Sequence, residues 1–286
     1  MNNFKLYCIF VLSLSFFCFS IQNAKAQSAW TKKKGKLFSQ ISYSTIPNYS
    51  EIFNDKDYIT SRSISDNTLQ LYGEYGVNDN LTLLVNVPFK LIKTGDAIEN
   101  STVPLSIVST RKSGFGNIQI GLKHNIYRGK MIVSGQLTVE ANTSFFDKTS
   151  GIRSGYDAWT FTPTVNVGKG YENYYFQGFI GADIRTNDYS SNFRIGGEFG
   201  LTSIKKTTLI VFVDIIESFN NGDIILPQTS LETALYINNQ DYAAYGLKGL
   251  YSLTDNLGFS VGFGGAFSAN NVAKQAALSA GLFFKI

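Results

Sequence analysis

Residues 257–268 read LGFSVGFGGAFS, and their alternation decides the fold class. One parity holds large apolar residues, at Leu257, Phe259, Val261, Phe263 and Phe267. The other parity holds only glycine, serine or alanine. A strict period of two separates an apolar face from a small or polar face, which indicates a β-strand between two different surroundings. Residues 277–286, ALSAGLFFKI, repeat the pattern and predict a second strand.

Further segments alternate in the same way. The twelve strands that we expect are residues 37–45, 69–77, 81–89, 118–126, 131–139, 159–167, 174–184, 193–201, 209–215, 243–253, 257–267 and 278–286. A soluble β-sandwich or jelly roll also alternates, but its strands average about five or six residues. Most strands expected here are close to the length of about ten residues that a tilted strand needs to cross a bilayer.

The connections between these segments alternate in length. Short turns are expected at residues 78–80, 127–130, 169–173, 203–206 and 254–256. Longer polar loops are expected at residues 46–66, 91–113, 145–155, 186–192, 217–240 and 269–274. Short periplasmic turns and long extracellular loops are typical of outer-membrane barrels. The sequence therefore predicts an all-β fold, a single closed antiparallel transmembrane β-barrel of about 12 strands.

The first 26 residues have the pattern of a secretory signal peptide. Lys5 precedes a long apolar run, and Ala24-Lys25-Ala26 supplies the small residues of a cleavage site. A retained membrane helix is the alternative, but the cleavage site stands where cleavage is expected. We therefore expect residues 1–26 to be a cleaved signal peptide and residues 27–286 to be a barrel. Export would deliver it to the outer membrane of a Gram-negative cell, with membrane lipid as its first partner.

The composition excludes several classes of function. Both cysteines, Cys8 and Cys18, lie in the expected signal peptide, so the mature chain would have no thiol for a disulfide or a nucleophile. Charged residues make up 16% of the chain and aromatic residues 14%, a balance that suits a lipid-facing wall with aromatic girdles. The 25 basic residues nearly match the 21 acidic ones, and no basic run predicts nucleic-acid binding.

Catalytic chemistry finds little support in the sequence. The one histidine, His124, shares its parity with Ile120 and Leu122 and is expected on the lipid-facing side near a turn. A Ser-His-Asp triad in the lumen would need a histidine of the opposite parity. No phosphate-binding glycine motif occurs. We expect no enzyme activity, no catalytic residue, no cofactor and no metal site.

The opposite parity sends charged residues of both signs into the barrel. The expected lumen-lining residues are Glu74, Lys90, Lys123, Glu140, Asp183, Arg185, Arg194, Glu198, Asp214 and Lys248. Apolar residues share the lumen, at Tyr72, Leu84, Tyr175, Phe179, Ile210, Phe212 and Leu250. Such an interior suits either a wet passage for small, partly hydrophobic solutes or a set of ion pairs that merely closes the barrel. Twelve strands fall between the filled eight-stranded barrels and the open porins, so barrel size leaves both readings open.

Two prolines conflict with a continuous wall, because proline has no N–H to donate to a strand ladder. Pro88 lies near the outer end of its expected strand. Pro163 lies in the middle of residues 159–167, where we expect it to interrupt the pairing with a neighbour. A β-bulge is the simpler interpretation, and a functional gap in the wall is the alternative.

Two short segments carry a resemblance to a known family. Residues 113–123, SGFGNIQIGLK, resemble a strand motif of the outer-membrane family named after the MetA-pathway of phenol degradation. Residues 154–159, SGYDAW, with Pro163 and residues 174–179, YYFQGF, are similar to that family's paired middle strands. Asn117 stands where the family more often has an acidic residue. Residues 235–242, LYINNQDY, also resemble XagA-like proteins. The resemblance implies an outer-membrane barrel grouped with channels for hydrophobic compounds, without catalytic residues.

Three functions follow from this pattern. The first is a passive outer-membrane channel or transporter for small, possibly hydrophobic, organic solutes. The second is a closed barrel that serves as a surface scaffold and binds an extracellular polymer or protein through its long loops. The third is a lipid-modifying enzyme, which would need serine and carboxylate groups clustered at the outer rim.

Overall fold

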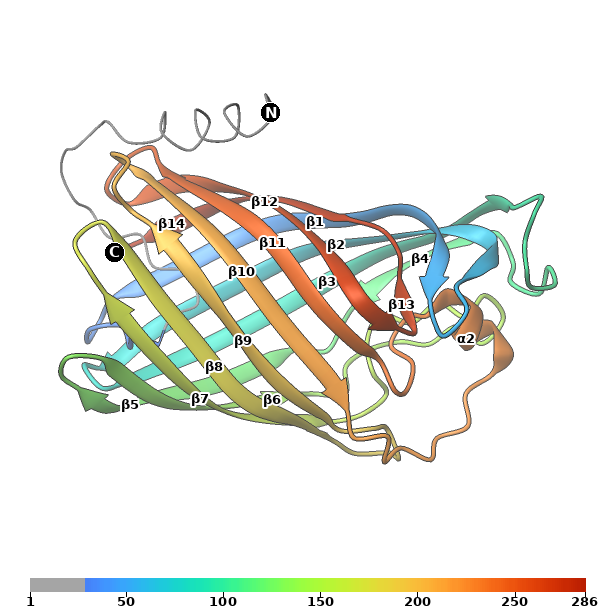
Figure 1. The fold of residues 1–286 in the computed structure, drawn as a ribbon, viewed down its shortest axis with the longest axis horizontal. Coiled ribbons are helices and arrows are strands. Elements are labelled where there is room, and N and C mark those ends of the chain that lie inside the picture. The colour runs from blue at the N-terminus through green and yellow to red at the C-terminus, as the bar shows by residue number, and fades with distance from the viewer. Residues whose placement is uncertain (1–28) are drawn as a thin grey trace, which may run out of the picture.

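The alternating segments pair in sequence order and close into a barrel (Figure 1). The computed structural model describes residues 29–286. Its strands are β1 (Leu37–Phe53), β2 (Tyr58–Asn78), β3 (Leu81–Ala97), β4 (Thr110–Phe115), β5 (Gln119–Arg128), β6 (Ile132–Glu140), β7 (Thr160–Gly170), β8 (Tyr174–Arg185), β9 (Asn192–Leu201), β10 (Thr207–Ser218), β11 (Asp241–Ser252), β12 (Leu257–Asn270), β13 (Val272–Ala273) and β14 (Ala277–Lys285). The one helix in this range, α2 (Gln228–Thr233), is short. No helix between residues 29 and 286 is long and apolar enough to cross a bilayer.

Closure of the wall depends on β1, which pairs antiparallel with β2 on one side and β14 on the other. The register runs from Phe38 opposite Lys285 to Thr45 opposite Leu278. Twelve strands of residues 29–286 form the wall, while β4 and β13 are short additions at one end. A closed sheet has no free edge, so its backbone groups are satisfied without water. The predicted 12-stranded antiparallel barrel is confirmed.

The two faces of the wall follow the alternation in the sequence. Val261 and Leu282 are each 53% exposed on the outside, and Phe259, Phe263, Leu278 and Phe284 are exposed beside them. Ser260 on the opposite parity is buried in the lumen. His124 is exposed on the outer face close to the turn after β5, as its parity predicts. The outer surface is therefore apolar where lipid would contact it.

The two ends of the barrel differ as expected. The turns that follow β2, β5, β7, β9 and β11 are short and lie at the end where the C-terminus is marked (Figure 1). The longer connections and α2 lie at the other end. Ile286 and Leu37 exchange two backbone hydrogen bonds, so both ends of the described chain lie on the side of the short turns. This side is the periplasmic one in an outer-membrane barrel.

The expected loops at residues 46–66 and 91–113 are partly wrong. Strands β1 and β2 continue to a short turn at residues 54–57, and β3 continues to Ala97. Ile52, Ile64 and Ile92 are completely buried in these extensions, where they pack against a folded loop. The strands therefore continue beyond the bilayer-crossing length because a second apolar core exists there. The wall is taller along β1–β3 than along the rest of the barrel.

Pro88 is accommodated where the neighbouring strand is interrupted. It pairs regularly with Gln70 on β2, and on its other side the chain leaves the ladder between β4 and β5. Gly116 N–H donates to the carbonyl of Pro88 at 2.9 Å across this interruption. The missing N–H of Pro88 therefore lies where pairing passes from β4 to β5, so no regular strand pairing is lost there.

Pro163 interrupts the pairing of β7 with β8, as predicted, but not with a bulge. Pairing with β8 is absent at Thr162 and Pro163, yet Thr160 opposite Arg185 and Thr164 opposite Gly181 keep one register. Pairing with β6 continues through Leu137 opposite Pro163. The bulge interpretation is wrong because no residue is inserted. A Cβ at Gly181 would lie only 2.5 Å from the Pro163 carbonyl oxygen, so the strands stay close and no gap opens.

Candidate functional site

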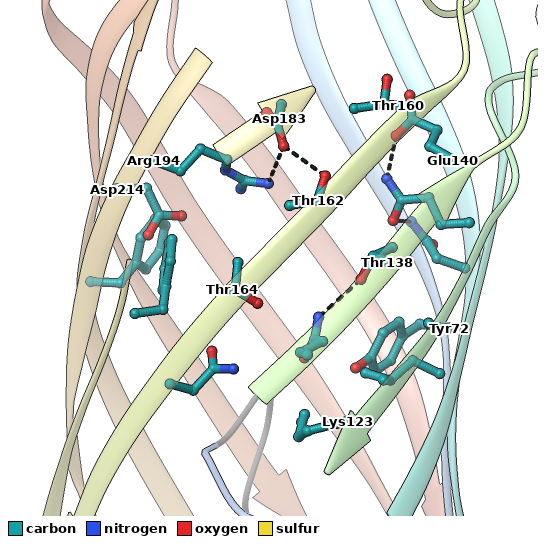
Figure 2. A pocket seen from close by; sticks show the side chains of 18 of the residues that line it. Tyr72, Lys123, Thr138, Glu140, Thr160, Thr162, Thr164, Asp183, Arg194 and Asp214 are labelled. Atoms are coloured by element: carbon teal, nitrogen blue, oxygen red, sulfur yellow. Dashed lines mark hydrogen bonds and ion pairs between the residues drawn. The ribbon is translucent and has the colours of Figure 1, made fainter. Parts of the chain in front are cut away.

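A cavity of about 530 Å³ occupies the lumen and is the strongest candidate site (Figure 2). Inward side chains of β5–β10 supply most of its lining, and β2, β3 and β11 add a few more. Tyr156 and Tyr236 reach it from loops at the extracellular end. Figure 2 shows the labelled side chains of several strands converging on this one space. The cavity is large enough for a small organic molecule.

One side of the cavity is a ladder of hydroxyl and amide groups on β5–β7. Thr160, Thr162, Thr164 and Asn166 succeed one another along the inward face of β7. Gln119 on β5 donates to Glu140 on β6 at 2.5 Å. The hydroxyls of Thr160 and Thr164 and the amide nitrogen of Asn166 are buried and have no hydrogen-bond partner among residues 29–286. Buried polar groups are normally hydrogen-bonded, so this ladder is suited to water or a polar solute.

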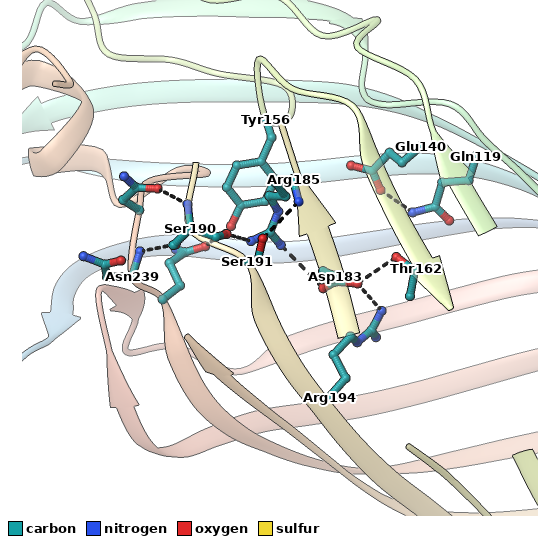
Figure 3. A network of polar contacts seen from close by, with 12 residues as sticks. Gln119, Glu140, Tyr156, Thr162, Asp183, Arg185, Ser190, Ser191, Arg194 and Asn239 are labelled. Atoms are coloured by element: carbon teal, nitrogen blue, oxygen red, sulfur yellow. Dashed lines mark hydrogen bonds and ion pairs between the residues drawn. The ribbon is translucent and has the colours of Figure 1, made fainter. Parts of the chain in front are cut away.

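An ion-pair centre on β8 and β9 lies next to the ladder (Figure 3). Asp183 accepts from Arg194 at 3.3 Å, from Arg185 at 3.5 Å and from the Thr162 hydroxyl at 2.8 Å. Arg185 also lies over the Tyr156 ring, 4.0 Å from its centroid. The ion pairs of Asp183 with both arginines offset the free-energy cost of burying these charges, because an unpaired buried charge costs several kcal/mol. The Thr162 bond also joins β7 to β8 at the interruption beside Pro163.

The part of the cavity formed by β8 and β10 is aromatic. Phe179 on β8 and Phe212 on β10 both line it. The guanidinium of Arg194 lies 5.8 Å from the Phe179 ring centroid, and the ammonium of Lys248 lies 5.9 Å from the Phe212 centroid. A cation at this distance from a ring is attracted to its π-face. The lumen thus presents apolar ring faces beside charged groups.

A buried carboxylate closes the inner part of the lumen. Glu74 on β2 is 1% exposed and lies 3.3 Å from the Lys123 ammonium and 3.0 Å from that of Lys32. Tyr72 donates its hydroxyl to the same carboxylate at 2.8 Å. Lys32 does not belong to a strand. Its pairing with Glu74 brings the segment before β1 into the lumen.

This segment, residues 29–36, is called the inner strap below. Its Ala29 N–H donates to the Gln177 side chain on β8 at 2.8 Å, and Lys32 N–H donates to the Thr82 hydroxyl on β3 at 2.7 Å. Trp30 packs edge-on against Tyr175 with ring centroids 5.9 Å apart. The inner strap begins beside β8 and continues into β1, which lies six strands away in the ring of twelve, so it crosses the periplasmic opening.

An apolar cluster fills the lumen beside the inner strap. Phe38, Ile210, Leu250 and Phe283 are buried together, and Tyr72 packs against them. These side chains come from β1, β10, β11 and β14, while the cavity is lined mainly by the facing strands. This part of the lumen is packed like a protein core, so any passage at this level is displaced toward β5–β9.

The long loop between β10 and β11 folds into the extracellular opening. Residues 219–240, called the outer cap below, include α2. Buried apolar residues join the cap to the tall wall, namely Tyr49, Ile52, Ile64, Ile92, Ile152, Ala234, Leu235 and Ile237. The hydroxyls of Tyr49 and Tyr58 each donate to cap carbonyls, of Thr233 and Leu231, at 2.7 Å. The outer cap is therefore part of a second core.

The segments behind the family resemblance meet at the base of the outer cap. The Asn117 amide donates to the carbonyl of Tyr156 at 2.8 Å, and the Ser154 hydroxyl donates to the carbonyl of Phe115 at 2.7 Å. A Cβ on Gly155 would lie 1.6 Å from the Asn117 oxygen. Glycine at residue 155 is therefore required for this close contact, which places Tyr156 at the cavity. An amide donor at residue 117 suits this geometry better than a carboxylate would.

Eight of the ten expected lumen residues line the cavity. These are Lys123, Glu140, Asp183, Arg185, Arg194, Glu198, Asp214 and Lys248. Glu74 lies below the cavity with Lys32, and Lys90 lies above it, where it bonds to Asp66 at 2.7 Å under the Tyr236 ring. Glu198 accepts from the Tyr175 hydroxyl at 2.7 Å. The ten residues therefore occupy three levels rather than one ring.

Sequence reasoning missed both closures. Lys32 precedes the first strand, so the alternation of strand residues does not tell whether its side chain points into the lumen. The run Lys32-Lys33-Lys34 is the one signal in the sequence that favours an ion pair there. Tyr236 lies in a segment expected to be an extracellular loop. Its signal was the apolar character of residues 234–237, ALYI, within a polar loop. Among residues 29–286, no group of three His, Cys, Asp or Glu side chains is arranged to hold a metal ion.

The fold and the lumen define this protein as a transmembrane β-barrel of the outer-membrane class. The chain belongs to the MetA-pathway of phenol degradation family, whose model matches residues 60–282. None of the curated proteins matches it.

Three solved structures share the architecture. The COG4313 outer membrane channel from Pseudomonas putida F1 superposes with a TM-score of 0.68 at 13% identity, covering 92% of this chain and 100% of that one. The NanC porin gives a TM-score of 0.53 at 8% identity, covering 87% and 100%. The translocator domain of the autotransporter NalP from Neisseria meningitidis gives 0.52 at 9% identity, covering 89% and 90%. At these identities the likeness concerns the fold.

Proposed function

We propose that this protein is a passive outer-membrane channel for small, partly hydrophobic organic solutes. The observation that carries the proposal is the lumen cavity of about 530 Å³, whose lining combines hydrogen-bonding groups with phenylalanine ring faces. A barrel that only displayed loops would gain stability by filling this space with side chains. Family membership and the similar fold of a described outer membrane channel support the same function.

The ten charged residues expected in the lumen serve two roles in this proposal. Those that line the cavity hold water and the polar part of a solute, while Glu74 and Lys90 hold the two closures in place. The Phe179 and Phe212 rings contact the apolar part of the solute. Transport is passive and needs no catalytic residue, cofactor or metal ion.

Reconstitution tests the channel directly. Purified protein in a planar bilayer should give discrete conductance steps, and liposomes that contain it should swell in small amphiphilic solutes faster than in sugars of similar size. A matched variant is Phe179→Ala with Phe212→Ala, which keeps every charge but removes the ring faces. It should keep ion conductance and lose the preference for amphiphilic solutes. Absence of both conductance and swelling in correctly folded protein would refute the proposal.

A surface scaffold is the second candidate. The outer cap favours it, because packing against the wall and hydrogen bonds from β1 and β2 give the extracellular end a fixed shape. In that case an extracellular polymer or protein would bind cells that display the barrel, and replacement of residues 219–228 would abolish binding. A barrel that acts only as a scaffold would give neither conductance steps nor liposome swelling in the reconstitution test.

Residues 1–26 lie outside the described part of the chain, and their role remains a proposal. We propose that they are a signal peptide cleaved after Ala26, because the sequence pattern there matches the substrates of signal peptidase. N-terminal sequencing of protein from an outer-membrane fraction should begin at Gln27. An intact N-terminus in that fraction would contradict cleavage.

A further inference from the structure

The two phenylalanine rings of the cavity each lie directly opposite a glycine. Phe179 on β8 faces Gly196 on β9, and Phe212 on β10 faces Gly246 on β11. Gly246 in turn faces Gly264 on β12. On this side of each ring the inward surface therefore consists of bare backbone.

Contact distances show that the rings occupy the space a side chain would need. A Cβ on Gly196 would lie 2.7 Å from Cζ of Phe179, and a Cβ on Gly246 would lie 2.5 Å from Cζ of Phe212. A Cβ on Gly264 would lie 3.8 Å from the same Phe212 atom, so this ring reaches across two strands. Each ring thus extends sideways along the wall instead of projecting across the lumen.

Any side chain at these glycines would have to displace the ring, together with the Asp214 carboxylate at Gly196 or the Phe263 carbonyl at Gly246. The wall lies behind each ring and the cavity lies in front of it, so the cavity is the free direction. Arg194 and Lys248 lie near the rings, with cation-to-centroid distances of 5.8 and 5.9 Å, and would move with them. A change of one methyl group would therefore narrow the space that a solute must cross.

We infer that Gly196 and Gly246 determine the bore of the channel and hence the size of solute it admits. The inference rests on the proposed channel function and names the residues that set its selectivity. Phe179 and Phe212 supply apolar ring faces, and the glycines let these faces form a wall rather than an obstruction. Pore diameter is the primary filter for uncharged solutes.

Gly196→Ala is the sharpest test. The groups that it would meet are side-chain atoms of Asp214 and Phe179, whereas Gly246→Ala would also meet the backbone carbonyl of Phe263. Gly196→Ala should lower single-channel conductance by about twofold and shift the swelling cut-off to smaller solutes. Gly249→Ala is the matched control, because its Cβ would meet nothing closer than 3.5 Å and shares the outward parity of exposed Leu247.

A second variant distinguishes an effect on the channel bore from a defect in folding. Gly196→Ala combined with Phe179→Ala should restore conductance and cut-off to at least the original values, because the displaced ring is gone. If Gly196→Ala folds and conducts like the original protein, the inference is overturned while the channel stands. If Gly196→Ala does not fold, Phe179→Ala and Phe212→Ala alone must raise the cut-off, and unchanged values overturn the inference. If the original protein does not conduct, both the inference and the proposed function fail.

Discussion

The two closures of the lumen are built from different interactions. The outer cap is held by a cluster of buried apolar side chains that includes Ile64, Ile92 and Ile237. The inner strap is held by the Lys32–Glu74 ion pair, by a few hydrogen bonds and by the edge-on packing of Trp30 against Tyr175. Apolar burial is lost only when the surfaces separate, whereas water can replace each polar bond in turn. We therefore expect the inner strap to open at a lower free-energy cost than the outer cap. The outer cap stays folded over the cavity.

Removal of the carboxylate at the inner strap should have the largest effect on stability. Glu74→Gln leaves the buried Lys123 ammonium and the Lys32 ammonium without this partner, and breaking a buried ion pair costs about 3–5 kcal/mol. Urea unfolding from lipid vesicles measures the loss. Single-channel conductance should rise at the same time, because the strap loses its charged anchor.

Glu51→Gln is the control for Glu74→Gln. It removes the same charge from an exposed pair with Lys274 at the extracellular end, where the effect should be small. Glu74→Gln together with Lys123→Met should recover part of the loss, since one buried cation is then removed as well. Equal stability of the Glu74→Gln and Glu51→Gln variants would show that charge does not hold the strap.

Truncation of a buried side chain in the outer cap should have the next largest effect on stability. Ile237 is 2% exposed in the apolar cluster, so Ile237→Ala should cost about 2–5 kcal/mol of the free energy that keeps the cap folded. Ile225→Ala is the matched control in the same loop, because Ile225 is 94% exposed. Hydrogen exchange of residues 228–240 measures cap opening. Equal exchange in the two variants would mean that apolar packing does not hold the cap.

The sequence predicted the wall between these closures far better than the closures themselves. Alternation at residues such as Phe259 and Val261 reports the contrast between lipid and lumen, and that contrast exists along every bilayer-crossing strand. Outside the bilayer, either face of a strand can be buried or exposed to water, so this contrast between the two faces is lost. The part of β1 after Thr45 and the part of β2 before Asn67 therefore carry no such signal, and the sequence predicts a loop at residues 46–66.

The charged lumen residues show the same limit at the level of the site. Parity states that a side chain such as Asp183 points inward, but not which other strands it meets. Pairing of Asp183 with Arg194 depends on the register of β8 against β9, which the sequence does not specify residue by residue. Lys32 and Tyr236 lie outside the strands, so no periodicity could place them in the lumen.

The comparison of the two closures assumes that the barrel wall between them lies in the lipid bilayer. Val261 is 53% exposed on β12, and an arginine there at the bilayer midplane should cost about 2–4 kcal/mol. Val261→Arg should lower the folded fraction in vesicles, measured by the shift between folded and unfolded bands on a gel. Gln275→Arg, in the loop before β14, adds the same charge outside the bilayer and serves as control. An unchanged folded fraction for Val261→Arg would place that position outside the lipid.

The smallest expected effect concerns an ion pair at the edge of the extracellular end. Asp147, in the loop between β6 and β7, lies 2.5 Å from the Lys112 ammonium, and this hydrogen bond lowers the pKa of Asp147 below its usual value near 3.8. A carboxylate whose pKa is lowered by folding stabilises the fold above its unfolded pKa, and the contribution disappears as the pH falls through the lowered value. Asp147→Asn should therefore cost about 1 kcal/mol or less near neutral pH, as is usual for surface pairs.

Hydrogen exchange of residues 145–154 compared between the original protein and Asp147→Asn measures this contribution at each pH, because intrinsic exchange rates cancel in the ratio. Protection should be higher in the original protein above pH 3.8 and should converge with the variant at lower pH. Residues 228–240 of the outer cap provide the internal control, since their apolar packing should give a ratio near one throughout. A ratio for residues 145–154 that stays constant through the acidic range would show that the Lys112 pair contributes nothing. A cap ratio that follows the same curve would show instead that ionic contacts, as at the inner strap, also hold the outer closure.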